Sequence, residues 1–318
     1  MDEGRIIEKK KTEEHMRRLT RAFAVGLVLA FIATACTSGT TTTPSPTADA
    51  SPRAPGSTQP RLDLSTYQYA LQTKGRIRIG TQEDNTPFSV RNPATGKWEG
   101  FDVAIGREIA KAIFGASDDP DKYIEYVPVT SATRIPFLTD NKADMIIKTF
   151  TINDDRRKQI DFTDAYFKTG QRILVKKDNT TINEAADLAG KTVCAQLGST
   201  GEQNVSAATS NAARMLLLDS YPACLLALQQ GQADAVSTDE TILFGLAKQD
   251  ANTKLVGKYF SAELYGIGVK KSAGGDRTGF VDFLNRTQVA MITNGTWAKL
   301  YEQYITPVSF DKKRTPDD

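Results

Sequence analysis

Residues 143–156 read Ala-Asp-Met-Ile-Ile-Lys-Thr-Phe-Thr-Ile-Asn-Asp-Asp-Arg, and this segment decides the fold. Its apolar run, Met145–Ile147, predicts a short buried strand. Thr149 and Thr151 follow and offer two hydroxyl groups and free backbone N–H groups at the carboxyl end of that strand. Open α/β sheets bind their ligands at the carboxyl ends of strands. The segment therefore predicts an α/β sheet with a polar ligand site at one edge.

An arginine completes this predicted site. Asn153 or Asp154 can cap a new helical turn, and Arg156 on that turn faces the same place as the hydroxyl groups. Its guanidinium is a planar fork of donors that fits a carboxylate in bidentate fashion. On this interpretation the segment is a receptor for a small anion. The alternative is a surface turn in which Arg156 forms a salt bridge with Asp154 or Asp155.

A second copy of the pattern occurs 90 residues later. Residues 137–146, Phe-Leu-Thr-Asp-Asn-Lys-Ala-Asp-Met-Ile, align with residues 227–236, Ala-Leu-Gln-Gln-Gly-Gln-Ala-Asp-Ala-Val. Each copy reads as a helix end, a turn, an Ala-Asp pair and an apolar strand. The first strand leads to a cation, Arg156, and the second to an anion, Asp239. An α-amino acid carries both charges on one carbon, so a cleft between two such units would bind both ends. The alternative is chance similarity.

The N-terminus has the features of a secretion signal. A basic stretch precedes a fourteen-residue apolar run at residues 22–35, which is too short to span a bilayer because a spanning helix needs about 20 residues. A basic region, a short apolar region and small residues before a break together predict a cleaved signal peptide. We therefore assign residues 1–35 to a signal peptide that starts at Met1 or Met16.

Cys36 follows the predicted cleavage site. Residues 33–36, Ala-Thr-Ala-Cys, resemble the lipobox of bacterial lipoproteins, in which the cysteine is diacylated and becomes the first residue, although Ala33 stands where leucine is usual. The alternative is an ordinary secreted protein with an unmodified cysteine. Residues 37–60 consist mainly of Thr, Ser, Pro, Ala and Gly and cannot bury a core. Residues 36–61 are therefore predicted to be a lipid anchor and tether at the extracytoplasmic face of the cell membrane.

Charge and histidine counts exclude several classes of function. Removing the seven Lys/Arg and five Asp/Glu of residues 1–35 from the totals of 40 and 38 leaves 33 of each, so the mature chain is neutral. It has no basic stripe for nucleic acid. The single histidine is His15, inside the leader, which excludes Ser-His, Cys-His and His-metal sites from the mature protein. We predict no enzyme activity, no metal and no cofactor.

Two cysteines remain if Cys36 is acylated. Cys194 lies in the apolar stretch at residues 192–196, and Cys224 lies in the first turn of a helix predicted to start near Tyr221. An oxidising compartment favours a disulfide between them. It would close a loop of about 30 residues and stabilise the fold by roughly 3–4 kcal/mol in the chain-entropy model. Two free buried cysteines are the alternative.

Hydrophobic periodicity predicts alternating strands and helices between about Leu62 and Phe310. We expect strands at residues 76–81, 123–129, 172–176, 192–196, 233–236 and 265–269. Helices are expected at residues 102–114, 131–139, 184–188, 239–249, 276–293 and 297–304. Asp102 and Ser131 are the expected caps of the first two helices. Another helix opens at residues 198–201, where Ser199 and its small neighbours leave N–H groups free to face an anion. Alternation of this kind predicts mostly parallel sheets with helices on both faces.

These segments resemble a known family. Residues 100–110, Gly-Phe-Asp-Val-Ala-Ile-Gly-Arg-Glu-Ile-Ala, are similar to the signature of family 3 extracellular solute-binding proteins, the polar amino-acid receptors of ABC importers, although Ala104 stands where an acid is usual. Four further motifs, at residues 79–88, 149–156, 198–200 and 237–239, occur in the same order along the chain as in the family. The resemblance covers about residues 72–306. Among members it is greatest to actinobacterial glutamine/glutamate-binding lipoproteins, which also carry cysteines like Cys194 and Cys224.

The resemblance implies an α/β fold of the periplasmic-binding-protein type II. Two α/β lobes are joined by a two-strand hinge and close on a ligand in the cleft between them. The two crossings would lie near residues 168–173 and 262–267. Lobe 1 would then comprise residues 62–170 and 266–310, lobe 2 residues 171–265, and residues 311–318 a flexible tail. We expect a monomer.

The resemblance also implies ligand contacts, residue by residue. Arg156 is expected to bind the α-carboxylate, helped by the backbone N–H of Thr151 and by Thr200 from lobe 2. Asp239 is expected to accept the α-ammonium and to share it with Thr149. Burial of these charges requires that each is paired and hydrogen-bonded.

Polar positions in lobe 1 predict the side-chain specificity. Gln82 stands where receptors for basic amino acids carry an acid, and Asn85 and Ser131 stand where many relatives have aromatic walls. Arg134 resembles the arginine that reads an acidic side chain in glutamate/aspartate receptors, and Lys148 is a second cation. Two cations and no free acid predict glutamate or aspartate as ligand, with glutamine or asparagine tolerated.

Both cations have plainer interpretations. Lys148 can be a solvated lysine at a sheet edge, and Arg134 can be a helix-surface arginine paired with Asp140 or Glu125. In either case the prediction of an acidic ligand would lose its basis.

Three functions from different classes fit the sequence. The first is a receptor that delivers its amino acid to an ABC permease, and the second is a sensory receptor that presents its bound form to a membrane signalling protein. The third is an enzyme on the same scaffold, such as the dehydratases that share the fold, which would need a general acid over its substrate. Glu83, Asp84 and Glu240 are the candidates for that acid, and they are more simply interpreted as loop carboxylates.

Overall fold

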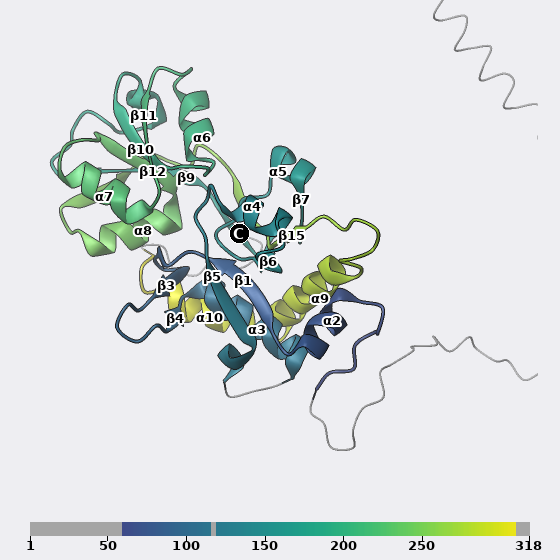
Figure 1. The fold of residues 1–318 in the computed structure, drawn as a ribbon. Coiled ribbons are helices and arrows are strands. Elements are labelled where there is room, and N and C mark those ends of the chain that lie inside the picture. Colours follow the sequence, from purple (N-terminus) through teal and green to yellow (C-terminus); the bar gives the residue numbers. More distant parts are fainter. Residues whose placement is uncertain (1–58, 116–118, 310–318) are drawn as a thin grey trace, which may run out of the picture. The chain divides into compact units, whose positions relative to one another are not determined.

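The computed structural model describes residues 59–115 and 119–309 of the 318-residue chain. The predicted signal peptide, Cys36, nearly all of the tether and the tail lie outside these residues. The described part is an α/β structure with two five-stranded sheets, each packed against helices (Figure 1). We call the sheet that contains β1, with its helices, lobe 1, and the sheet that contains β10, with its helices, lobe 2. Within the described ranges no helix is long and apolar enough to cross a membrane.

The sheet of lobe 1 has the strand order β5-β1-β6-β15-β7. Its strands are β1 (Ile77–Thr81), β5 (Ile124–Pro128), β6 (Met145–Ile146), β7 (Ile160–Phe162) and β15 (Gly268–Lys270). β1 pairs in parallel with β5 and β6, whereas β15 is antiparallel to β6 and β7. A small antiparallel sheet extends this lobe with β2 (Asp84–Asn85), β3 (Ser89–Arg91) and β4 (Trp98–Glu99).

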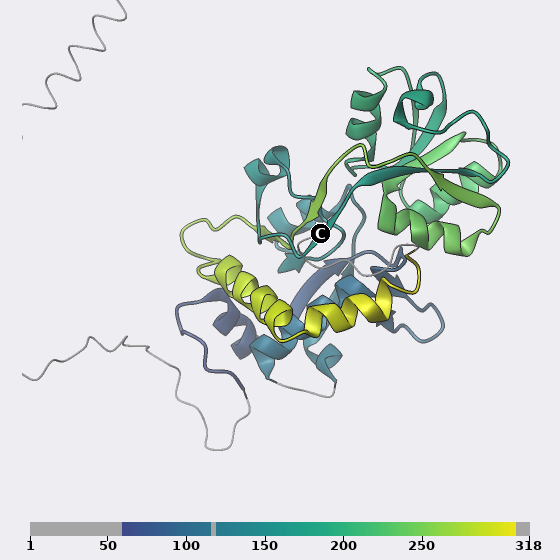
Figure 2. The same cartoon turned by 180° about the vertical axis from the view of Figure 1, so that it is seen from behind.

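Six α-helices and one short 3-10 helix belong to lobe 1. They are α2 (Tyr67–Lys74), α3 (Phe101–Phe114), η1 (Pro120–Tyr123), α4 (Arg134–Thr139), α5 (Asp154–Gln159), α9 (Phe280–Thr293) and α10 (Thr296–Tyr304). Figure 2 shows α9 and α10 following one another along the lobe, and both contact α3. The apolar side of α3, with Ile105, Ile109 and Ile113, is fully buried in one core with Ile77 and Ile79 of β1.

The sheet of lobe 2 has the strand order β11-β10-β12-β9-β13. Its strands are β9 (Gln171–Lys176), β10 (Thr192–Gln196), β11 (Arg214–Leu218), β12 (Ala235–Asp239) and β13 (Thr253–Val256). β10 pairs in parallel with β11 and β12, and β9 is antiparallel to β12 and β13. Its helices are η2 (Ala185–Leu188), α6 (Gly201–Ala208), α7 (Tyr221–Gln229) and α8 (Glu240–Gln249).

Two antiparallel segments carry the chain between the sheets. β8 (Phe167–Thr169) leads from lobe 1 into β9, and β14 (Glu263–Tyr265) leads back toward β15. The two segments pair with each other, with Glu263 opposite Thr169 and Tyr265 opposite Phe167. The two crossings expected from the family resemblance are therefore present.

The prediction of mostly parallel sheets is wrong in one respect. In each sheet two of the four strand pairings are antiparallel. The physical reason is the crossing itself, because β9 enters lobe 2 and β15 re-enters lobe 1 from the opposite direction to their neighbours. For the same reason the single strand expected at residues 265–269 is two strands in two different sheets, β14 and β15.

Two predicted caps and two helix starts are wrong, and one of these helices, α4, begins at Arg134 rather than at residue 131. Gly100, not Asp102, is the N-cap of α3, and Thr133 precedes α4 without a side-chain cap. Asp102 and Ser131 instead make long-range contacts described below. The helix expected from residue 276 begins at Phe280, because Gly274, Gly275 and Gly279 adopt positive φ angles in the turns before it. The sequence analysis did not predict strands β2, β3, β4, β7, β11 and β13, the 3-10 helix η1 or helix α2.

The structure joins Cys194 to Cys224 in a disulfide with a Cα–Cα distance of 5.5 Å. Cys194 lies in β10 and Cys224 in α7, and both side chains are fully buried. The bridge therefore fixes a helix to its own sheet inside lobe 2. The alternative of two free cysteines is not what the structure contains.

Candidate functional site

Three cations from lobe 1 are buried close together. Arg134 is on α4, Lys148 follows β6, and Arg156 is on α5, and their exposures are 2%, 0% and 8%. Arg134 and Arg156 both stack on the ring of Phe150, with guanidinium carbons 3.8 and 5.2 Å from its centroid. Burial lowers the pKa of each cation, and mutual repulsion lowers the pKa of Arg134 and Lys148 further. A site that concentrates positive charge in this way favours an anion.

Arg156 is buried on α5, in the helical turn that follows Thr151. The side chain of Asn153 accepts from Arg156 N at 2.9 Å and caps α5, which turns the arginine inward. Its guanidinium donates to Thr151 O at 2.6 Å and to Gly198 O of lobe 2 at 3.3 Å. Among the described residues Arg156 forms no salt bridge with Asp154 or Asp155, and Asp155 pairs with Lys158 instead.

Arg134 donates only to backbone oxygens. Its Nη1 reaches Lys148 O at 3.1 Å and its Nη2 reaches Gly198 O at 3.5 Å, and its buried Nε has no hydrogen-bond partner. The plainer pairing with Asp140 or Glu125 does not occur, because these acids pair with Lys142 and Arg76. Arg134 is therefore a buried cation with unused donor capacity.

Lys148 is tied to both lobes. Its Nζ donates to Ser131 Oγ at 2.6 Å and to Gln196 Oε1 of lobe 2 at 2.8 Å, and lies 5.2 Å from the ring centroid of Tyr221. The solvated interpretation is wrong, because the side chain is fully buried. An ammonium has three donors, and these two bonds use two of them.

A glutamine pair closes this end of the site. Gln196 Nε2 donates to Gln82 Oε1 at 3.0 Å and to Asp219 O at 2.6 Å, and Ser131 Oγ donates to Gln196 Oε1 at 2.9 Å. Gln82 Nε2 in turn donates to Asp84 Oδ1 at 2.6 Å. Gln196 thus uses both its oxygen and its NH₂ group on protein partners, which fixes the orientation of its amide.

Asp239 lies at the end of β12 and precedes α8. It is buried, and Tyr265 Oη donates to its Oδ2 at 2.5 Å. Burial, with repulsion from Glu263, raises the pKa of Asp239 to about 7, and the charges of Lys148 and Arg156 oppose this shift. Near neutral pH this carboxyl group therefore exists in both protonation states, and only its ionised form can pair with an ammonium group.

Thr149 adopts a positive φ of 39°, which is rare for a residue with a branched side chain. Asp102 stabilises this conformation, because its Oδ2 accepts from Thr149 N at 2.8 Å. Its Oδ1 accepts from Tyr166 Oη at 2.7 Å. Asn85 Nδ2 also lies 3.3 Å from Thr149 Oγ1. Asp102, expected to be a helix cap, is therefore a buried support of the strand end at which Thr149 stands.

Glu263 on β14 is an acid that the sequence reasoning missed. Its carboxylate accepts from Thr151 Oγ1 at 2.6 Å, from Thr200 Oγ1 at 2.9 Å, from Asn204 Nδ2 at 2.6 Å and from Ser261 Oγ at 2.7 Å. These donors come from lobe 1, from lobe 2 and from the crossing itself. A hydroxyl has one proton to donate, so in this arrangement Thr151 and Thr200 can only accept a further hydrogen bond.

The cationic cluster has no salt bridge inside the described part of the chain. Arg134, Lys148 and Arg156 have no carboxylate within the 4.0 Å that defines an ion pair. Ser199, the remaining predicted contact, accepts from Gly201 N at 3.1 Å and supports the turn before α6. Over the same residues no group of three His, Cys, Asp or Glu side chains is placed to bind a metal ion.

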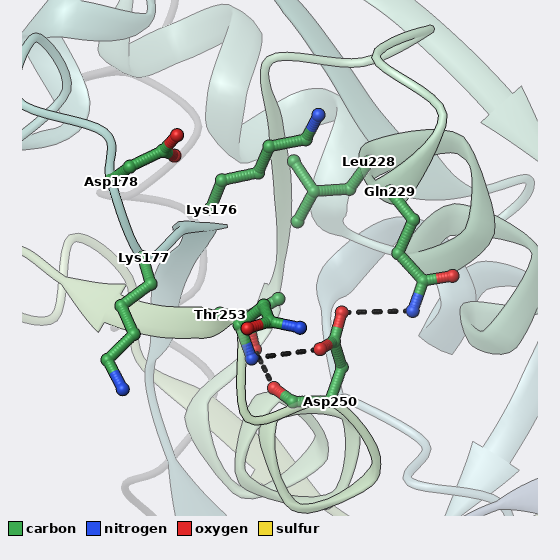
Figure 3. A pocket seen from close by; sticks show the side chains of 8 residues that line it. Lys176, Lys177, Asp178, Leu228, Gln229, Asp250 and Thr253 are labelled. Atoms are coloured by element: carbon green, nitrogen blue, oxygen red, sulfur yellow. Dashed lines mark hydrogen bonds between the residues drawn. The ribbon is translucent and has the colours of Figure 1, made fainter.

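Two hollows differ in their relation to this cluster. A pocket of about 360 Å³ is lined by Gln82 from lobe 1 and by Asp219 and Ser220 from lobe 2, and so borders the glutamine pair. A larger pocket of about 530 Å³ lies at the other end of β9 from Gln171 (Figure 3). It is lined by Lys176, Lys177, Asp178, Leu228, Gln229, Asp250, Asn252 and Thr253. None of the predicted site residues lines it, so size alone does not mark the site.

Residues 77–307 match the family described as bacterial extracellular solute-binding proteins, family 3. The chain belongs to this family. The match spans both sheets, both crossings and every residue of the cluster. Family 3 proteins are binding receptors and not enzymes, which leaves the carboxylates Glu83, Asp84 and Glu240 without a catalytic role. Only Glu83 lies in a loop as expected, because Asp84 belongs to β2 and Glu240 begins α8. Glu83 pairs with Arg91, and Glu240 pairs with Arg172.

Three curated relatives of this family 3 protein are named for the binding of glutamine or glutamate. A glutamine-binding protein of Geobacillus stearothermophilus is 43% identical over 202 residues, which cover 63% of this chain and 75% of the relative. The ABC transporter glutamine-binding protein GlnH of Bacillus subtilis is 37% identical, with 74% and 83% covered. The glutamate-binding protein GluB of Corynebacterium glutamicum is 32% identical, with 73% and 79% covered.

Solved structures of amino-acid-binding proteins share this fold. An ancestral arginine-binding protein bound to arginine is 36% identical and superposes with a TM-score of 0.65, covering 72% of this chain and 98% of the other. The L-cysteine receptor of Neisseria gonorrhoeae is 28% identical with a TM-score of 0.70, and 78% and 96% are covered. The family 3 chain is therefore a two-lobed receptor of the periplasmic-binding-protein type II fold.

Proposed function

We propose that this protein captures glutamate or aspartate, and tolerates glutamine or asparagine, between its two lobes. One observation carries the proposal: three cations, Arg134, Lys148 and Arg156, are buried in one cluster without an ion-paired acid in the described residues. Buried charges require partners. A ligand with two carboxylates supplies two negative charges to this cluster.

The α-groups of the ligand would use opposite sides of the cleft. Arg156 would bind the α-carboxylate with its guanidinium, aided by the Thr151 backbone N–H and the turn at Ser199 and Thr200. Asp239 would accept the α-ammonium. Thr149 would share that ammonium group, held in position by the bond from its N–H to Asp102.

The side chain of the ligand would point toward Arg134 and Lys148. Arg134 has an unpartnered Nε and Lys148 has a third donor, so both can donate to a side-chain oxygen. Ser131 and Gln82 would act indirectly, since both hold Gln196 against Lys148. A carboxylate gains more from two cations than an amide does.

Glutamine as the preferred ligand is the second candidate. The relatives with 43% and 37% identity are named for glutamine. Gln196 offers a neutral oxygen to Lys148, so an additional ligand amide would find one cation already partly satisfied. Whether glutamate or glutamine binds more tightly therefore depends on how strongly Arg134 attracts the side chain of the ligand.

We further propose that the protein is a lipoprotein anchored through Cys36 at the extracytoplasmic face of the membrane, and that it delivers its ligand to an ABC permease as a monomer. Import is favoured over sensing by the relative named as part of an ABC transporter. The domain limits given by the sequence, with lobe 2 at residues 171–265, are part of this proposal.

Calorimetric titration of the purified protein with glutamate, aspartate, glutamine, asparagine and arginine tests the proposal. We expect micromolar or tighter binding of the acids and weaker binding of the amides. Tighter binding of glutamine than glutamate would establish the second candidate, and tight binding of arginine would overturn the cationic side-chain pocket. Mass spectrometry of the membrane fraction would show whether Cys36 carries lipid.

A further inference from the structure

Gly245 lies in the interior of α8, where the sequence should favour another residue. The helix runs from Glu240 to Gln249, and Gly245 is buried between Phe244 and Leu246. Glycine is among the least favourable residues inside a helix, because it loses the most backbone freedom on folding. Its φ angle lies outside the left-handed region, so the backbone conformation does not require glycine. The reason must lie in what surrounds it.

A methyl group at this position would collide with the other lobe. A Cβ built on Gly245 would lie 2.1 Å from Thr86 O and 2.8 Å from Thr86 C. Thr86 belongs to lobe 1, in the turn between β2 and β3. A backbone carbonyl cannot rotate aside as a flexible side chain can. Helix α8 of lobe 2 therefore touches lobe 1 main chain against main chain.

A second glycine makes a similar contact elsewhere in lobe 2. A Cβ on Gly198 would lie 2.7 Å from the Cα of Ala132 in lobe 1. The carbonyl of Gly198 also accepts from Arg134 and Arg156. Gly198 has a φ of 76°, so its glycine has a local reason as well. Gly245 has no positive φ angle, so the contact with the other lobe is the reason that remains for a glycine at this position.

We propose that Gly245 is a positioning residue for ligand capture, because the missing side chain lets α8 approach Thr86 and so sets how far the lobes close. The inference rests on the proposed function. Asp239 is the N-cap of the same helix, and a rigid helix moves as one body. A methyl group at residue 245 would therefore hold Asp239 away from Thr149 and Arg156 while each lobe keeps its own core.

The substitution G245A separates closure from folding. Alanine favours the helix, so we expect the melting temperature without ligand to equal or exceed that of the wild type. Affinity for glutamate and glutamine should fall by about tenfold or more, because apparent affinity scales with the fraction of closed protein. Stopped-flow measurement should place this loss in the dissociation rate, with association nearly unchanged. The radius of gyration at saturating ligand should exceed that of the wild type.

G106A is the matched control. Gly106 also lies inside a helix, α3, but its Cβ would meet the flexible Ile79 side chain of the same lobe at 3.0 Å. We expect G106A to bind ligand as the wild type does. If G245A shows wild-type dissociation kinetics, or a lower melting temperature without ligand, the inference about Gly245 is wrong and the proposed function is unaffected. A wild-type protein that bound none of the tested amino acids would overturn the proposed function, and the inference with it.

Discussion

Two segments of this chain, residues 137–146 and 227–236, build the same structure in different lobes. In lobe 1 the N–H groups of residues 142 and 143 donate to Phe137 O at 2.8 and 3.0 Å, and in lobe 2 those of residues 232 and 233 donate to Ala227 O at 2.9 and 3.2 Å. The turns contain Asn141 and Gly231, both with positive φ. In each strand pair an aspartate, Asp144 or Asp234, accepts at 2.7 Å from a backbone N–H of the neighbouring strand.

The two units differ in the residues that follow these segments. Lobe 1 continues with Lys148, two threonines and Arg156, whereas lobe 2 continues directly to Asp239 and α8. The shared part sets backbone direction and strand order. The unshared part sets the sign of the charge at the strand end. One scaffold used twice can therefore present a cation and an anion to the two ends of a single ligand.

Loss of the cation at the first strand end should have the largest effect. We expect Arg156→Ala to weaken binding of every amino acid by about 3–5 kcal/mol, or hundreds of fold and more, since it leaves a buried α-carboxylate unpaired. Calorimetry with glutamate and glutamine measures the loss. Arg157→Ala is the matched control, because Arg157 is the exposed neighbour on the same helix. Micromolar binding by the Arg156 variant would show that Arg156 is not the cation that binds the α-carboxylate.

The second unit alone carries a covalent link, from Cys224 on α7 to Cys194 on β10. Reduction should lower the free energy of unfolding by roughly 3–4 kcal/mol, as expected for a closed loop of about 30 residues. Melting curves with and without reductant measure this, and the Cys194→Ala/Cys224→Ala double variant should be insensitive to reductant. A wild type whose melting temperature ignores reductant would show that lobe 2 does not depend on the link.

The anionic end should make binding depend on pH. The raised pKa of Asp239, about 7, means that the ligand-free protein holds a proton there below neutral pH. Affinity should fall by up to about tenfold per pH unit as pH decreases below 7, since the ligand ammonium needs the ionised carboxylate. Stability of the ligand-free protein should change in the opposite sense and decline as pH rises from about 4 to 7, because the native state binds more protons than the unfolded chain.

Asp239→Asn provides the control for this pH dependence. Its affinity should be low and nearly flat between pH 5 and 8. Asp102, whose pKa burial also raises to about 7, faces Tyr166 and Thr149 and remains in both proteins. An unchanged pH profile in the variant would assign the titration to Asp102 rather than to the second strand end.

The smallest expected effect concerns the ligand side chain. Arg134→Ala should weaken glutamate binding by about tenfold more than glutamine binding, because a charge-assisted hydrogen bond contributes more than a neutral one. Competitive titration of the two ligands gives the ratio directly. Arg76→Ala is a suitable control, since Arg76 is exposed and pairs with Glu125. Equal losses for both ligands would place Arg134 outside the side-chain pocket.

Local patterns predicted the scaffold well where local interactions decide it. The strand predicted at residues 192–196 has those bounds as β10, because an apolar run there ends at a polar residue and a glycine turn. Asn153 caps α5 as expected, since a cap is satisfied within three residues. The pairing of Cys194 with Cys224 was predicted from an oxidising compartment and from the presence of two cysteines besides Cys36.

Residues whose role depends on distant partners were misread or missed. Asp102 and Ser131 have the chemistry of caps, but each finds a buried partner from a distant segment of the chain, Thr149 N and Gln196. Glu263 looks like a surface acid in sequence, yet four donors from both lobes surround it. One signal could have been used: a polar residue at the end of an apolar strand, as at Gln196, indicates a residue that contacts the site.

The support beneath Thr149 also connects the cleft to an aromatic reporter. Trp297 Nε1 donates to Tyr166 O at 2.8 Å, and the hydroxyl of the same tyrosine donates to Asp102, which holds Thr149 N. The chain has only two tryptophans, and Trp98 stacks on Tyr126 instead. A change at the strand end is thus three contacts from an indole ring. We therefore expect the ultraviolet emission of Trp297 to change when a ligand binds, which would report occupancy without an attached dye.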